Sequence, residues 1–234
     1  GFQRGLFGWL ANAPWSNPGF SGFFLSLVIF GFGGGITGVT LGTQQINIMA
    51  HNTLRIPGHF HVTVVGGTAL PFMALTYSVI PLIFRRNVAF WGAAKWQPYL
   101  FAIGIVILSM SMTFAGSFGV PRRSADISFA KAPFTLEFPP IVDLLLAGIG
   151  IGGTITSIAV LLFIAIAVKS VFLGEKLDFA AMQPGMSGVP QGVVKLPAQT
   201  HSGENAEAVH KSGAPGTIVL VFVFLAVFIL YYFA

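Results

Sequence analysis

The sequence predicts an all-α protein that crosses a membrane several times. Of its 234 residues, 54% are hydrophobic and only 8% are charged, whereas about a quarter of the residues of a soluble domain are charged. The mean hydropathy is +0.81. A transmembrane helix needs about 20 largely apolar residues, and five stretches of the chain meet this requirement. We therefore expect a polytopic transmembrane helix bundle with about five spans.

The five predicted spans divide the chain into three regions. The first region, residues 1–173, contains four spans, at about 19–44, 58–84, 98–118 and 138–173. Residues 174–215 are rich in Gly, Pro, Ser and charge, which is typical of an extramembrane loop. Residues 216–234 form the fifth predicted span, which is aliphatic and Phe-rich and carries no obvious chemistry.

Charge and cysteine content exclude several classes of function. The pI is about 9.8, but the net charge is only +5 and the basic residues are spread over loops, so nucleic-acid binding is not expected. The sequence contains no cysteine, which excludes disulfides and thiolate-bound zinc, iron–sulfur or copper centres within this chain.

The distribution of lysine and arginine predicts a cytoplasmic N-terminus. In that orientation eight of these residues lie on the cytoplasmic side and four lie outside, as the positive-inside rule favours. The four outer residues are Arg55, Arg122, Arg123 and Lys131.

Two histidines open the second predicted span. His59 and His61 flank Phe60, and ionisable residues inside a membrane are usually functional. On an α-helix, residues two apart are separated by about 200°, at about 100° per residue. The two imidazoles would therefore point to opposite sides and hold two haem irons rather than share one metal, because neutral imidazole is the usual proximal haem ligand. The alternative is that both rings pack between helices and bond the backbone or water.

Other polar residues fall at the outer membrane interface near this pair. His51 and Asn52 precede the second span, where they either bond haem carboxylates and ordered water or form an ordinary polar turn. Arg122 and Arg123 follow the third span, and the arginine fork matches carboxylates such as haem propionates. Without the histidine pair, two such arginines would be interpreted as a solvated anchor.

Glycines in the first span indicate close helix packing. Gly34, Gly38 and Gly42 lie four apart, a spacing that lets helices approach each other. The GxGxxG patterns that begin at Gly33 and Gly148 do not follow strands, so we reject dinucleotide binding at both.

Together these residues resemble subunit I of the haem–copper terminal oxidases, most closely the B-type (ba-type) branch. The His-Phe-His sequence at 59–61, the His-Asn-Thr sequence eight residues earlier and the Pro-Arg-Arg sequence at 121–123 match in order and spacing. The similarity covers most of residues 1–173. It implies that His59 is the proximal ligand of a high-spin haem, where O2 binds, and that His61 is one of two axial ligands of a low-spin haem.

The resemblance also implies roles for the neighbouring residues. Phe60 would lie in the short electron path between the haems, and Arg122 and Arg123 would bind haem propionates. His51 and Asn52 would lie above the propionates, in the region of proton and water exit. Asn47 departs from the family, which usually has an aspartate near a propionate at this position.

The family's remaining metal ligands are absent from this sequence. Its copper site needs three histidines and a linked tyrosine on earlier helices, and its low-spin haem needs a second histidine. The resemblance therefore implies the C-terminal part of subunit I, with the N-terminal part and the copper on a separate partner chain.

The expected function is that of a respiratory terminal oxidase in the plasma membrane of a prokaryote. The chain would contribute two haem sites to the larger subunit I core, which reduces O2 to water and couples this to proton translocation. Expected partners are a subunit II-like electron-entry subunit and a donor that is cytochrome c, a small copper protein or a quinol. Two alternatives are a nitric oxide reductase of the same superfamily, with iron in place of copper, and a haem-free structural membrane subunit.

Overall fold

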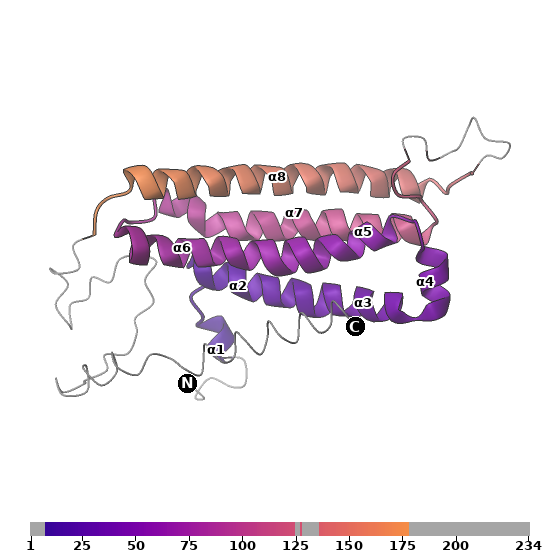
Figure 1. Ribbon diagram of the computed structural model, residues 1–234, viewed down its shortest axis with the longest axis horizontal. Coiled ribbons are helices and arrows are strands. Elements are labelled where there is room, and N and C mark those ends of the chain that lie inside the picture. Colours follow the sequence, from indigo (N-terminus) through magenta and orange to yellow (C-terminus); the bar gives the residue numbers. More distant parts are fainter. Residues whose placement is uncertain (1–7, 125–126, 128–135, 178–234) are drawn as a thin grey trace, which may run out of the picture. The chain divides into compact units, whose positions relative to one another are not determined.

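The computed structural model describes residues 8–124, 127 and 136–177, all of which belong to one compact unit of the chain. Within these residues the structure is helical and has no strand, and only two isolated β-bridges occur. Figure 1 shows the long helices running along a common axis. The prediction of an all-α bundle is confirmed.

The first span is a continuous helix with a π-helical turn in its middle. A short helix α1 (Gly8–Ala11) precedes α2 (Pro18–Val28), which continues as η2 (Ile29–Gly34) and α3 (Gly35–Gly42). The Asn17 side chain caps α2, because its Oδ1 accepts from the backbone N–H groups of Gly19 and Phe20 at 2.9 and 3.2 Å.

The second span also contains π-helical turns. The short helix α4 (Gln44–Ala50) leads to α5 (Arg55–Phe60), η3 (His61–Ala69) and α6 (Leu70–Phe84). The segments η2 and η3 pack against each other. Because π-helical turns are frequent at functional sites, the packed pair of η2 and η3 indicates a candidate functional region near His61.

Two longer helices complete the bundle. Helix α7 (Trp91–Ser117) packs along α8 (Ile141–Leu173) and also contacts α2, α5 and η3. The α7–α8 contact is close because both helices carry glycine there: a Cβ added to Gly152 would lie 2.8 Å from the Gly104 carbonyl oxygen.

Four described helical segments are long and apolar enough to cross a membrane, and they start close to the predicted positions. They are Pro18–Gly42, Arg55–Phe84, Trp91–Ser117 and Ile141–Leu173. The third begins seven residues before the predicted start at 98, because Pro98 is buried inside α7 and the helix extends outward past the apolar stretch. The fifth predicted span, 216–234, and the predicted loop beyond residue 177 lie outside the described residues.

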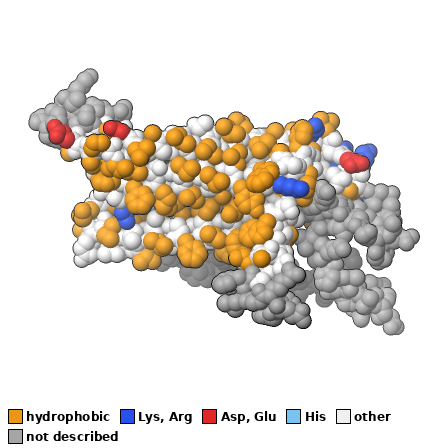
Figure 2. Space-filling model, turned by 180° about the vertical axis from the view of Figure 1, so that it is seen from behind, with side chains coloured by type: hydrophobic (Ala, Val, Ile, Leu, Met, Phe, Trp, Pro, Cys, Tyr) orange, Lys and Arg blue, Asp and Glu red, His pale blue; other side chains and the backbone are white. Residues whose placement is uncertain are grey.

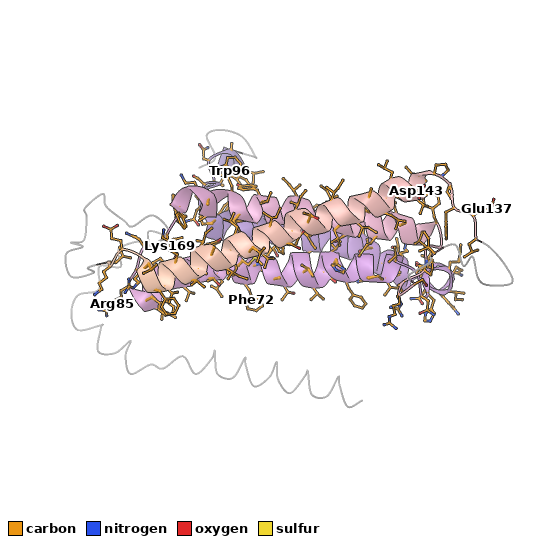
Figure 3. All side chains as sticks on the ribbon, turned by 90° about the horizontal axis from the view of Figure 1, so that it is seen from above. Phe72, Arg85, Trp96, Glu137, Asp143 and Lys169 are labelled. Carbon is orange, nitrogen blue, oxygen red and sulfur yellow. The ribbon has the colours of Figure 1, made fainter. Side chains whose placement is uncertain are left out.

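The bundle has an apolar surface between two polar ends. Figure 2 shows hydrophobic side chains across one face, with charged side chains toward both ends. In Figure 3, Glu137 and Asp143 lie at one end, and Arg85 and Lys169 lie at the other. The chain reversals place the start of α5 and the end of α7 at the Asp143 end, which we call the histidine end because α5 carries His59.

Candidate functional site

The side chain of His59 lies against the first span. Its Nδ1 is 2.8 Å from Thr37 Oγ1 on α3. A Cβ added to the neighbouring Gly38 would lie 3.2 Å from His59 Cε1, so the ring occupies space that a larger residue would take. The glycine-rich first span therefore positions the imidazole as well as packing the helices.

The hydrogen bonds of Thr37 determine which nitrogen of His59 carries the proton. Thr37 Oγ1 is 2.6 Å from the carbonyl oxygen of Gly33, which can only accept. Since a hydroxyl has one hydrogen, Thr37 donates it to Gly33 and accepts from His59 Nδ1–H. A neutral His59 then has its lone pair on Nε2, the nitrogen available to a metal.

The ring of His61 also carries its hydrogen on Nδ1, but it bonds a different partner. Its Nδ1 is 2.7 Å from the carbonyl oxygen of Pro57, one turn earlier on α5. The carbonyl accepts, so Nδ1 carries the hydrogen and Nε2 has the lone pair. His61 is also the first residue of η3, so the two histidines lie at the junction of an α-helical and a π-helical segment.

Both rings have the arrangement expected of haem ligands. Metal-bound histidines usually donate their second ring N–H to a protein acceptor, and His59 and His61 each do so. In the described part of the chain, no group of three or more His, Cys, Asp or Glu side chains converges on a point. A single imidazole binds a metal firmly when other ligands are supplied, as a porphyrin supplies them, so the residues present fit haem. Phe60, between the histidines, is 55% exposed.

At the histidine end, the structure brings Asn52 and Arg122 together. The Arg122 backbone N–H donates to Asn52 O at 2.9 Å, and Arg122 Nη2 donates to Asn52 Oδ1 at 3.1 Å. The adjacent Thr53 and Pro121 form an isolated β-bridge. Arg122 Nε is buried and has no partner among the described residues. This donor fits a carboxylate supplied from outside those residues, such as a haem propionate.

The other predicted residues of this region are more exposed. His51 and Arg123 are both exposed. Asn47, which departs from the family pattern, has a structural role here: its Nδ2 donates to the Leu41 carbonyl at 2.8 Å, near the end of α3. A carboxylate could not make that bond, because it has no hydrogen to donate when ionised.

Sequence reasoning missed Thr37 and Arg55. Thr37 lies in a stretch interpreted only as a packing surface, and its position just before Gly38 was the available signal. Arg55 was counted only as an outer charge, although it lies four residues before His59 and therefore on the same helix face.

Comparison with known proteins identifies the family of this chain. Residues 3–155 match the family described as Cytochrome C and Quinol oxidase polypeptide I. The chain is 32% identical over 166 residues to cytochrome c oxidase subunit 1 of Thermus thermophilus, covering 69% of this chain and 28% of that protein. It is 30% identical over 117 residues to quinol oxidase subunit 1 of Bacillus subtilis, covering 50% of this chain and 18% of that protein.

A solved structure gives the same result for the fold. The cryo-EM structure of a heme-copper terminal oxidase dimer matches with a TM-score of 0.62 and 25% identity, covering 86% of this chain and 34% of that chain. The chain therefore spans between 18% and 34% of the length of these three relatives. Because the family match includes both histidines and well over half of the sequence, this chain belongs to the Cytochrome C and Quinol oxidase polypeptide I family.

Proposed function

We propose that this chain provides the two-haem ligand helix of a respiratory terminal oxidase, in the B-type branch. In this proposal His59 is the axial ligand of the high-spin haem and His61 is one axial ligand of the low-spin haem. The observation that carries it is that both imidazoles donate from Nδ1 to a protein acceptor and keep Nε2 free in the described structure. The family match independently supports an oxidoreductase of the respiratory chain.

Each neighbouring residue has a physical role in this proposal. When bound, the haems would supply redox-active iron, for electron transfer at the low-spin haem and for O2 reduction at the high-spin haem. His59 and His61 fix the position and basicity of the axial nitrogens. Phe60 would lie in the short electron path between the haems. Arg122 and Arg123 would bind propionate carboxylates, and His51 and Asn52 would lie above the propionates in the region of proton and water exit.

The remaining parts of the enzyme come from outside these 234 residues. We propose that a partner, which supplies the N-terminal part of subunit I, holds the copper and the second low-spin haem ligand. A subunit II-like protein would deliver electrons from cytochrome c, a small copper protein or a quinol. The relatives include both a cytochrome c oxidase and a quinol oxidase, so the choice of donor needs direct measurement. The proposed location is a prokaryotic plasma membrane, with the N-terminus in the cytoplasm and proton translocation coupled to O2 reduction.

Optical spectra of the purified complex test the two ligand assignments separately. His59→Ala should remove the high-spin haem signal and leave the low-spin signal largely intact, and His61→Ala should do the reverse. His201→Ala, in the predicted extramembrane loop, is the matched control and should keep both signals. The assignment is wrong if either ligand variant keeps both signals. Elemental analysis of the same sample should find copper; non-haem iron without copper would instead identify a nitric oxide reductase.

A further inference from the structure

Two parallel hydrogen bonds join α5 to α3 beside the proposed haem ligand. His59 Nδ1 bonds Thr37 Oγ1 at 2.8 Å, and Arg55 Nη2 donates to Thr40 Oγ1 at 3.1 Å. Arg55 and His59 are four residues apart on one helix, and the two threonines are three apart on the other, so each pair shares a helix face. Thr40 Oγ1 also donates to the Thr37 carbonyl at 2.8 Å, which ties the two contacts together.

The charge of Arg55 is held by neutral groups. Its second described side-chain contact is Nη1 to Ser117 Oγ at 2.6 Å, on α7. Its Nε is buried and has no partner in the part of the chain that the structure describes. Arginine is ionised at any physiological pH, and Arg55 is the first residue of the second span, with its Nε buried against the bundle. The guanidinium is thus a fixed cation, clamped between α3 and α7, one helical turn from His59.

We propose that Arg55 provides a fixed positive charge that raises the reduction potential of the haem held by His59. Thr37 orients the His59 ring, and Thr40 holds the Arg55 guanidinium in place. The inference rests on the proposed ligand role of His59. Ferric haem carries one more positive charge than ferrous haem, so a nearby cation destabilises the ferric state. The effect is substantial because charges interact more strongly inside a protein than in water. Thr37 and Thr40 are the positioning residues here, because they hold His59 and Arg55 by hydrogen bonds.

Redox titration of the purified complex, with the two haems followed by their separate optical bands, tests the charge. Arg55→Gln should shift the high-spin haem toward the ferric state by about tenfold, which is about 59 mV for a one-electron couple. Arg55→Lys keeps the charge and should recover most of the shift. Arg85→Gln removes an exposed arginine at the opposite end of the bundle (Figure 3) and should leave both potentials unchanged.

The outcomes separate this proposal from the one on which it depends. If the wild-type complex shows no haem bands, the proposed function fails. If both haems are present and Arg55→Gln changes neither potential, or shifts the low-spin haem more than the high-spin haem, only the role of Arg55 is overturned. Should Arg55→Gln not assemble, Thr40→Val removes an acceptor that fixes the guanidinium while keeping the charge. The Thr40→Val variant must then lower the reduction potential of the high-spin haem by less than tenfold in the ferric-to-ferrous ratio. An unchanged potential overturns the proposal.

The threonine part of the proposal has its own spectroscopic test. Thr37→Val removes the acceptor of His59 Nδ1–H and should move the iron–histidine stretching band of the ferrous high-spin haem in resonance Raman spectra. Thr37→Ser keeps a hydroxyl and should restore the band. Thr154→Val is the matched control, because Thr154 is exposed on α8 and bonds only its own helix at Gly150. An unmoved band in Thr37→Val overturns the positioning role.

Discussion

Buried polar groups differ in their hydrogen bonding between the two ends of the bundle. Away from the histidine end, Tyr77 donates to Gln97 Oε1 at 3.1 Å, and Gln97 Nε2 donates to the Ala159 carbonyl at 3.2 Å. This network is closed within the chain, and both side chains are at most 1% exposed.

Toward the histidine end, several buried polar atoms have no hydrogen-bond partner among the described residues. The buried side-chain atoms without a partner among the described residues all lie there: Arg55 Nε, Ser109 Oγ, Thr113 Oγ1 and Arg122 Nε. Buried polar groups in native proteins are normally satisfied, and each exception needs an explanation. Ser109 and Thr113 lie inside the contact of α7 with Gly58 on α5, so the contrast rests on the two arginines. Their unpaired Nε–H groups can bind partners from outside the described residues, while the closed network holds the helices together.

Among changes at the two ends, we expect the largest effect on haem binding from substitution of Gly38. Gly38→Val places a branched side chain where a Cβ alone would lie 3.2 Å from the His59 ring. We expect loss of the high-spin haem, measured by the optical spectrum of the purified complex. Gly42→Val, on the same helix at a position with no neighbour within 4 Å, should keep it. Retention of the high-spin haem in the Gly38 variant would show that α3 does not position the ligand.

A stability effect without a redox effect is expected in the closed network. Gln97→Leu leaves the buried Tyr77 hydroxyl without its acceptor, and removes the second donor to the Ala159 carbonyl, which keeps its backbone bond inside α8. One unsatisfied buried group costs about 1–3 kcal/mol, so the midpoint of thermal unfolding should fall. Gln45→Leu, at an exposed position on α4, should change it little. The haem potentials should not move in either variant; a shift in Gln97→Leu would contradict the division into two functional ends.

Arg122 should show the opposite pattern. Arg122→Ala removes a cation from the proposed propionate site and should lower the haem potentials without loss of haem, because the axial histidines remain. The effect of Arg123→Ala should be smaller, since Arg123 is exposed. Redox titration of the two variants distinguishes them, and unchanged potentials in Arg122→Ala would count against a propionate contact.

Much of the fold, and the residues of the candidate site that are close in sequence, were predictable for physical reasons. Apolar length fixed the four described spans, because a bilayer sets how many residues a helix needs. The histidine pair and the Pro-Arg-Arg sequence were recognisable because they are close together along the chain. The pairing of Arg122 with Asn52 was not, since 70 residues separate them.

The hydrogen bonds that distinguish the two ends were also beyond the sequence. Thr37 lies beside His59 in a region where η2 and η3 pack against each other. The sequence of a glycine-rich apolar segment does not predict where π-helical turns occur. The structural role of Asn47 could not be predicted either, because its partner, the Leu41 carbonyl, is a backbone atom and every residue has one.

The smallest expected effect tests whether the closed end really is only structural. Ser170 on α8 accepts from the Ala89 backbone N–H at 2.8 Å and donates to the Ile166 carbonyl at 2.6 Å. It therefore fastens the end of α8 to the segment between α6 and α7. Ser170→Ala should cost about 1 kcal/mol, since one half-buried backbone N–H loses its acceptor. Hydrogen exchange at Ala89 should accelerate, while exchange in α5 and both haem potentials should stay as in the wild type. Faster exchange at His59 would mean that the two ends are mechanically coupled through α7, and the haem site would then depend on the whole bundle rather than on its own helices.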